Sequence, residues 1–281
     1  MLLDNPGLTD ISTNSTAVSD IAHVVVVIPA HNEAARLGRL LASMSLARRR
    51  VSEKVSTSCV VVADACTDRT AEVARCFLTG GQDVLEEVEV RSVGRARQRG
   101  VASAIEGHED LRRVWIANTD ADTVVPDNWL TAQLRLANSG YDAVAGTVTL
   151  LEDDDWCPMV AARFERAYRW PPGTPHPHIH GCNLGVRAST YLEVGGWSER
   201  CSAEDGDLWR RLKTHARVLS SAESRVATSA RMHGRAPDGF AGHLVSLDQS
   251  AFPSRQPAHP CGCQDVDHAG CHELTPARSA S

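Results

Sequence analysis

The sequence lacks a hydrophobic run long enough to cross a membrane. Its longest strongly apolar stretch, Ile21 to Ala30, has about ten residues, whereas a spanning helix needs about 20. Residues 1–20 also contain no Lys or Arg, although a secretory signal peptide begins with a basic region. We therefore expect no transmembrane segment and a cytoplasmic chain.

Positive charge is also in deficit. The chain carries 29 Lys and Arg against 35 Asp and Glu, for a formal net charge of -6. Proteins that bind a nucleic-acid backbone usually present a basic field, so nucleic acid is not expected as a partner. The nine cysteines are odd in number and widely scattered, which favours reduced thiols over a disulfide framework.

The composition is that of a globular protein, and predicted strands and helices alternate along the chain. Hydrophobic residues make up 42% and charged residues 23%, which excludes collagen-like, coiled-coil and wholly disordered chains. Continuous β-branched runs predict buried strands at 23–29 and 59–63, and a third, short strand and a fourth strand are predicted at 84–90 and 113–118. Helical spacing of apolar residues predicts helices between them, at 34–50, 71–78 and 94–105. We therefore expect an α/β fold, an open, doubly wound and mostly parallel sheet with helices on both faces.

The second half of the chain is less regular. Its pattern predicts strands at 141–151, 183–186 and 224–232, helices at 156–168 and 203–214, and a loop at 170–181. We expect a flexible arm over 1–20, one domain over 21–249 with halves 21–123 and 124–249, and a disordered tail over 250–281. In that tail, four soft ligands could hold zinc, although their spacing fits no familiar finger: Cys261, Cys263, Cys271 and His272.

Polar residues follow three of the predicted strands. The segments are Pro29–Glu33, Asp64–Asp68 and Asn118–Asp122, and each contains carboxylates. The carboxyl ends of strands in such a sheet face one crevice, where ligands bind. Asn32 can cap the first predicted helix. Helix capping would also explain each acid singly, but it explains three acidic turns together poorly. A crevice of like charges needs a cation or a proton.

The strongest single motif is Asp120-Ala-Asp122, which directly follows a buried strand. Two carboxylates in this arrangement suit Mg²⁺ or Mn²⁺, which keep several waters and take further oxygens from a substrate diphosphate. Such an ion neutralises the charge that develops on a departing diphosphate. Polar turns contain this tripeptide by chance, so the motif alone is weak evidence for a metal site.

Taken together and in order, the motifs resemble those of family 2 glycosyltransferases, which have the GT-A fold. The matching segments are 24–33, 60–70, 94–100, 118–122, 181–187, 194–197 and 203–208. The resemblance extends over about residues 23–240. It implies an inverting glycosyltransferase that uses Mg²⁺ or Mn²⁺ and moves a sugar from a UDP- or GDP-sugar to a hydroxyl acceptor of unknown identity.

The resemblance also assigns nucleotide-binding roles, which fall on Pro29, Ala30, Glu33, Asp64, Arg97 and Asp120. Asp64 would hydrogen-bond the base, although the family often has two adjacent acids there and this chain has Ala63 before Asp64. Asp120 would contact ribose or metal, and Asp122 would be the metal ligand. Arg97 would face phosphate, or else be an exposed helix arginine.

For catalysis, the resemblance indicates Glu204 and Asp205. Asp205 would be the general base that takes the proton from the acceptor hydroxyl, on the face opposite the departing diphosphate, which gives inversion. Glu204 would contact the acceptor or support Asp205. Both acids open a predicted helix, so N-terminal capping is the alternative explanation, and Asp207 is expected to be a capping or surface acid.

Donor and acceptor contacts are expected from Gly181, Asn183, Trp197, Arg231 and Arg235. The two arginines flank His233, which is either a third metal ligand or a polar loop residue, and they would clamp diphosphate oxygens. The glycines beside this segment, Gly234 and Gly239, would let it close as a lid. His176, His178 and His180 would bind zinc, contact the acceptor or simply be exposed, and Cys182 is expected to be a buried thiol.

Two other functions stay open at this point. Nucleotidyl transfer on the same fold would need a Gly-rich, basic loop after the first strand, which Pro29–Glu33 lacks. A binding protein without turnover is the second alternative, and the missing acid at Ala63 keeps it open. A polymer-extruding synthase is not expected, because no membrane segment is expected and aromatic residues, at 5% of the chain, are too few for a long sugar-stacking groove.

Overall fold

The computed structural model describes residues 20–78, 81–152, 156–171, 174–199, 203–232 and 239–249. At its centre lies β1 (His23–Ala30), all of whose residues are buried. Alternate residues of β1 face two hydrophobic cores, Val24, Val26 and Ile28 on one side and Val25 and Val27 on the other. The continuous apolar run is therefore explained by burial on both faces of the sheet.

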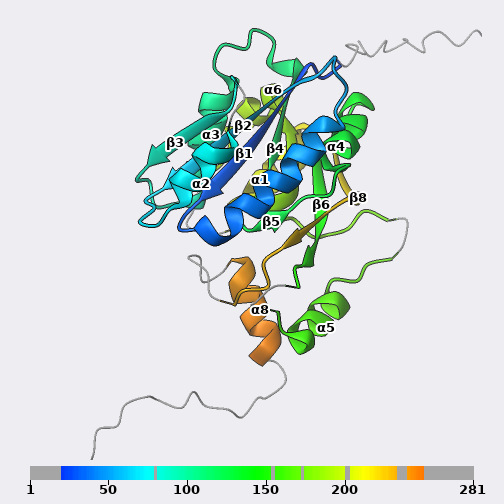
Figure 1. Cartoon of the computed structure of the whole chain (residues 1–281). Coiled ribbons are helices and arrows are strands. Elements are labelled where there is room, and N and C mark those ends of the chain that lie inside the picture. The colour runs from blue at the N-terminus through cyan, green and yellow to red at the C-terminus, as the bar shows by residue number, and fades with distance from the viewer. Residues whose placement is uncertain are drawn as a thin grey trace, which may run out of the picture.

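An eight-stranded sheet extends to both sides of β1, in the order β3-β2-β1-β4-β7-β6-β8-β5 (Figure 1). The first half is parallel: β2 (Ser56–Asp64) and β4 (Val114–Asn118) flank β1, and β3 (Val84–Val88) pairs with β2. The carboxyl ends of β1, β2 and β4 therefore meet at one edge. The sequence prediction of an α/β sheet with this parallel core is confirmed.

The second half adds antiparallel pairings. The strand β7 (Leu184–Arg187) runs antiparallel between β4 and β6 (Ala143–Leu150). Next to β6 lies β8 (Val218–Thr228), which is parallel to it, and the two-residue β5 (Thr123–Val124) closes the edge antiparallel to β8. One sheet thus joins the two predicted halves of the chain.

Helices cover both faces of the sheet. One core contains residues of α1 (Ala34–Arg49), α2 (Thr70–Phe77) and α4 (Trp129–Asn138). The opposite core contains residues of α3 (Val93–Ile105), α6 (Ala188–Glu193) and α7 (Glu204–His215). The helices α3 and α7, which come from different halves, therefore share one face of the sheet beside its carboxyl edge.

Two further helices form a separate layer below the sheet in Figure 1. They are α5 (Pro158–Ala167) and α8 (Phe240–Gln249). The rings of Phe164 and Phe240 meet edge to face, with 5.6 Å between centroids. This contact brings the start of α8 to the rim of the cavity described below. Two one-turn 3-10 segments, Leu111–Arg113 and Gly181–Asn183, precede β4 and β7.

Several predicted boundaries and one predicted cap are wrong. The strand predicted at 224–232 begins at Val218 and ends at Thr228, and α4, α6, α8 and β5 were not predicted. Asn32 does not cap α1: its backbone has φ 54°, and its Oδ1 accepts a hydrogen bond from the Thr67 backbone N–H at 2.8 Å. Glu33 occupies the N-cap position instead. The side chain of Asn32 therefore ties the turn after β1 to the turn after β2.

Some expectations cannot be compared with the structure. The predicted arm, apart from residue 20, and the predicted tail with its zinc ligands lie outside the described residues. Within the described part of the chain, no helix is long and apolar enough to cross a membrane.

Candidate functional site

A cavity of about 750 Å³ opens at the carboxyl edge of the sheet. It is lined by residues from both halves of the chain. The predicted site residues that line it are Pro29, Glu33, Arg97, Asp120, Asp122, Gly181, Glu204, Asp205 and Arg231. The turns after β1 and β4 and the start of α7 thus converge on one space, as the pattern of acids predicts.

The floor of this cavity is held by Arg97 of α3. Its side chain is 3% exposed and forms two ion pairs, from Nη2 to Asp120 Oδ1 at 2.6 Å and from Nη1 to Glu204 Oε1 at 2.7 Å. Burial alone would lower the pKa of Arg97, but the two carboxylates outweigh it and raise the pKa. The guanidinium therefore stays charged and joins the strand-end acids to the start of α7.

Two alternatives were predicted for Arg97, a contact with phosphate or an exposed position on its helix, and the structure matches neither fully. Arg97 is not an exposed helix arginine, and both guanidinium ends already have carboxylate partners. Trp197, predicted to contact donor or acceptor, is 1% exposed and lies under Arg97, whose Cζ is 4.9 Å from the ring centroid. Trp197 does not line the cavity, because its ring lies against Arg97 instead, and its predicted contact with donor or acceptor stays a prediction.

Glu33 and Asp122 meet at a second arginine, Arg231, which follows β8. One nitrogen, Nη2, lies 2.6 Å from Glu33 Oε1 and 2.9 Å from Asp122 Oδ2. The other oxygen, Glu33 Oε2, is buried without a hydrogen-bond partner. Burial raises the pKa of Asp122 to about 6, with Arg231 opposing and the charges of Asp120 and Glu33 adding to the rise.

Asp205 projects into the cavity from the first turn of α7. Its Oδ2 accepts a hydrogen bond from the Gly181 backbone N–H at 3.0 Å, and its Oδ1 from the Gly206 N–H at 2.7 Å. The N-cap position belongs to Ala203, which makes no side-chain cap. Asp205 is therefore not the N-cap residue, but its hydrogen bond to the Gly206 N–H in the first turn agrees with the N-terminal alternative as well as with a role in the cavity. Asp207 pairs with Arg211 and Arg210, and its side chain is 10% exposed, so it is not a surface acid.

Asp64, which the resemblance assigns to the base, lies outside the cavity lining together with the rest of its turn, 65–68, and its base contact stays a prediction. Its side chain is fully buried, with Oδ1 accepting from the Arg91 N–H at 2.7 Å and Oδ2 from the Ser92 N–H at 3.1 Å. Its backbone oxygen also accepts from His31 Nδ1 at 2.7 Å. The carboxylate thus shapes the segment between β3 and α3, and it does not line the cavity. Ala30, the last residue of β1, is 1% exposed and also lies outside the lining.

Asn183, for which a sugar contact is predicted, also lies outside the cavity lining, and that contact stays a prediction. This residue is 1% exposed. Its Oδ1 accepts from Trp129 Nε1, and its Nδ2 donates to the backbone oxygens of Thr147 and Ser224, each at 2.9 Å. The amide therefore cross-links the sheet to α4. Cys182, by contrast, is a buried thiol as predicted.

Strained turns surround the cavity. Among the described residues, four that are not glycine have positive φ: Asn32, Ala65, Arg91 and Ala203. They follow β1, β2 and β3 and precede α7. Such conformations cost free energy and concentrate at functional sites, where the surrounding structure enforces them.

The three loop histidines are neither exposed nor arranged around a metal. The Tyr168 and His178 rings stack with centroids 3.8 Å apart, and the His178 and His180 rings are nearly parallel at 6.5 Å. Burial, with smaller contributions from neighbouring histidines, lowers the pKa of His180 to about 3, so this imidazole is neutral. In the part of the chain that the structure describes, no three His, Cys, Asp or Glu residues could hold a metal by themselves.

Other cavity residues were missed or cannot be placed. The residues His31, Phe240 and His243, which were not predicted as site residues, line the cavity, and so does His180, for which an acceptor contact was one alternative. Only the helical spacing that begins at Phe240 could have indicated Phe240 and His243. Two predicted site residues, His233 and Arg235, lie in 233–238, outside the described residues. Their roles stay predictions.

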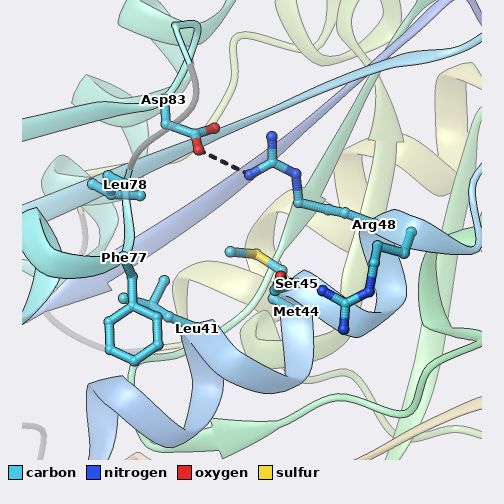
Figure 2. Close-up of a pocket in the computed structure, with 8 residues that line it drawn as sticks. Leu41, Met44, Ser45, Arg48, Phe77, Leu78 and Asp83 are labelled. Carbon is cyan, nitrogen blue, oxygen red and sulfur yellow. Dashed lines mark hydrogen bonds and ion pairs between the residues drawn. The ribbon is translucent and has the colours of Figure 1, made fainter.

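Two other hollows contain no comparable group of acids. One, of about 370 Å³, lies between α1 and α2, with Leu41 and Phe77 in its wall and an Arg48–Asp83 ion pair of 2.9 Å across it (Figure 2). The other, of about 380 Å³, lies beside Tyr168 and Trp170. The cavity at the strand ends is therefore the candidate site.

Comparison with known protein families shows which proteins the chain is similar to. Residues 25–191 match the sequence profile of glycosyl transferase family 2. The undecaprenyl-phosphate 4-deoxy-4-formamido-L-arabinose transferase of Aeromonas hydrophila is 23% identical over 230 residues, which is 82% of this chain and 66% of that protein. The transferase of the same name from Pseudomonas aeruginosa PAO1 is 24% identical over 212 residues, or 75% and 59%. The chain thus spans less than two thirds of these relatives.

Solved structures share the fold. Staphylococcus aureus TarS 1–349 in complex with UDP-GlcNAc gives a TM-score of 0.58 at 14% identity, covering 78% of this chain and 61% of that one. The mannosyltransferase PcManGT from Pyrobaculum calidifontis, in complex with GDP-Man and Mn²⁺, gives 0.55 at 20% identity, covering 83% and 65%. At these identities the likeness carries the fold alone, and it confirms the fold expected from the sequence.

Proposed function

The chain belongs to glycosyl transferase family 2, and from this premise we propose that its strand-end cavity binds a nucleotide-diphosphate sugar and transfers the sugar to an acceptor hydroxyl with inversion. The observation that carries the proposal is the convergence of the turn acids Asp120 and Asp122 with Asp205 in one cavity. A nucleotidyl transferase or a structural acid cluster would not need a carboxylate at Asp205.

The donor would lie against the turns after β1 and β4. Pro29 and Glu33 would contact the nucleoside, and Asp120 the ribose or the metal. TarS and PcManGT are described in complex with UDP-GlcNAc and GDP-Man respectively, so we propose that the donor is a UDP-sugar or a GDP-sugar. Because the Asp64 carboxylate is already used by backbone N–H groups, base selection would fall on other parts of the cavity wall.

The donor set of the cavity fits a hard divalent cation. Its oxygens come from carboxylates, and Glu33 Oε2 is buried with no partner. Asp122 would be a metal ligand, with Asp120 and Glu33 beside it, and the ion would take further oxygens from the diphosphate. Mg²⁺ or Mn²⁺ would supply charge neutralisation for the departing diphosphate.

Asp205 would act as the general base. As the acceptor oxygen bonds to the anomeric carbon, its proton passes to an Asp205 oxygen, and the bond from that carbon to the diphosphate breaks with the electron pair leaving on the diphosphate. The Gly181 N–H, which binds Asp205 Oδ2, fixes the carboxylate in place. Glu204 would position this turn through its ion pair with Arg97.

A second acceptor class follows from the names of the relatives. Those names contain undecaprenyl phosphate, and a phosphate acceptor would attack through an oxygen that is already anionic at neutral pH, so that no base is needed. Asp205→Asn separates the two classes: it should abolish transfer to a hydroxyl acceptor and spare transfer to a polyprenyl phosphate. The presence of Asp205 in the cavity favours the hydroxyl.

Thermal unfolding with nucleotides tests the proposal directly. The protein would be heated with UDP, GDP, ADP or CMP, each with and without Mn²⁺. A ligand at about 100 times its dissociation constant adds about 2.7 kcal/mol of apparent stability. Stabilisation by UDP or GDP that depends on Mn²⁺ is expected, whereas no shift with any nucleotide would contradict a nucleotide-sugar site. Stabilisation without sugar transfer to any acceptor would favour a binding protein.

A further inference from the structure

Arg231 occupies an unusual position in the cavity. It follows β8, in the second half of the chain, yet its Nη2 lies between Glu33 Oε1 at 2.6 Å and Asp122 Oδ2 at 2.9 Å. The arginine side chain is 30% exposed, and the two carboxylates are 8% and 13% exposed. Arg231 is thus the solvent-facing member of a cluster whose acids are buried below it.

The two cavity arginines divide the acids between them. Arg97 is paired with Asp120 and Glu204, and Arg231 with Asp122 and Glu33. Each carboxylate at a strand end that could bind a metal is therefore already paired with an arginine. A divalent ion that approached Asp122 would meet the positive guanidinium first, and like charges at such distances repel strongly in a partly buried site.

A diphosphate changes this balance. Pairs of its oxygens can accept two hydrogen bonds from one guanidinium, which is the geometry that arginine binds best. The same oxygens can also be ligands of a divalent ion. Arg231 can then exchange its carboxylate partners for phosphate oxygens, which leaves Asp122 free to bind the ion. The partial exposure of Arg231, against the burial of Arg97, makes it the arginine that can move.

We propose that Arg231 is the resident counter-ion of Asp122 and Glu33 and makes binding of the divalent metal conditional on the nucleotide diphosphate. This inference rests on the proposed function, because it takes the nucleoside diphosphate as the ligand. It assigns Arg231 a positioning role that precedes the reaction. By thermodynamic linkage, the factor by which nucleotide tightens metal binding equals the factor by which metal tightens nucleotide binding.

Direct measurement of Mn²⁺ binding tests the inference without any turnover. Free Mn²⁺ is followed by electron paramagnetic resonance during titration of the full chain, alone and with saturating UDP or GDP. The variants are Arg231→Gln, which removes the charge, and Arg231→Lys, which keeps it. The matched control is Arg225→Gln, which removes an exposed arginine from β8 outside the cavity lining and changes the net charge equally.

For the wild type and the control, nucleotide is expected to tighten Mn²⁺ binding by about tenfold or more. Arg231→Gln is expected to bind Mn²⁺ alone about tenfold or more tightly than the wild type and to show a smaller coupling to nucleotide, of which the part due to direct ligation by the diphosphate remains, while Arg231→Lys keeps weak binding of Mn²⁺ alone. Equal or weaker Mn²⁺ binding by Arg231→Gln, or no coupling in the wild type when nucleotide binds, would overturn the inference. If neither UDP nor GDP binds, the proposed function fails instead, and the comparison without nucleotide still tests the counter-ion role.

Discussion

Arg97 and Glu204, which are 107 residues apart in the sequence, meet in a buried ion pair of 2.7 Å. The second guanidinium nitrogen, Nη2, reaches Asp120 at 2.6 Å. A single side chain of α3 therefore links the turn after β4 to the first turn of α7. This link holds the two halves of the candidate site in register, because neither acid is paired with another cation at comparable distance within the described residues.

Replacing Arg97 should be strongly destabilising. Arg97→Met leaves the Glu204 and Asp120 carboxylates without their cation, and breaking a buried pair from one side costs about 3–5 kcal/mol. The free energy of unfolding in urea measures the effect. Arg99→Met is the control, since its pair with Glu86 is exposed on the arginine side and should contribute about 1 kcal/mol or less. Similar losses for both variants would contradict the role given to Arg97.

Asp205→Asn should remove catalysis while leaving the fold intact. The amide keeps the shape of the side chain but cannot accept the acceptor proton, and loss of a general base lowers the rate by about 10²–10⁴-fold. The rate of sugar transfer, measured at saturating donor, gives this factor. Asp207→Asn is the matched control in the same helical turn, because Asp207 is engaged with Arg210 and Arg211 outside the cavity. Asp205→Asn with wild-type turnover of a hydroxyl acceptor would reject Asp205 as base.

The parallel half of the fold was predictable because three of its strands, β1, β2 and β4, are mostly buried on both faces. The run Val24–Ile28 has no polar residue to place, so its strand and its central position follow from composition alone. The helix α4 was missed although Trp129, Leu130 and Leu134 recur at helical spacing and are buried. The strand β5 was missed because its two residues are too few for any periodicity to appear.

The site was predictable at the level of which turns converge, but not which way each side chain points. Asp64 and Asn183 have the polarity of ligand-binding residues, yet both are satisfied by groups that are distant in sequence: Ser92 for the first and Trp129 for the second. The same holds for Arg97, whose buried position depends on α7 packing beside α3. Long-range partners of this kind leave no local pattern.

Stability should fall as the pH is lowered, in part because of His23. Its ring nitrogens lie 2.6 Å from Ser56 Oγ and 2.8 Å from Ser58 Oγ. Burial, assisted by positive charge at His108 and Arg48, lowers its pKa from 6.5 to about 4. The folded state thus binds this proton less readily than the unfolded chain, so the stabilisation is present above about pH 6.5 and is lost as the pH falls towards 4.

The size of this effect is roughly 3 kcal/mol at most, since each pKa unit corresponds to 1.36 kcal/mol. Urea unfolding of the wild type and of His23→Gln, repeated from pH 7 to pH 4, isolates it. Glutamine can hydrogen-bond the same serines but does not titrate, so the stability of the variant should depend less steeply on pH. Parallel curves for the two proteins would show that His23 does not carry this dependence.

Gly181 should tolerate no side chain, because it lies against the guanidinium that organises the site. A Cβ built at Gly181 would be 2.6 Å from both terminal nitrogens of Arg97, and Arg97 is held from two sides by carboxylates and cannot retreat without losing them. Gly181→Ala is therefore expected to cost about 1–3 kcal/mol of stability, the usual range for overpacking. It should also lower transfer, because the Gly181 N–H that fixes Asp205 moves with the backbone.

Gly206→Ala provides the comparison within the same site. Gly206 donates to the other oxygen of Asp205, and nothing lies within 4 Å of a Cβ built there. As a helical position it should gain up to about 1 kcal/mol from alanine. Unfolding in urea and the rate of transfer are measured for both variants. If Gly181→Ala is as stable and active as Gly206→Ala, then Arg97 is free to move, and the rigid link between Asp120 and Glu204 does not exist in solution.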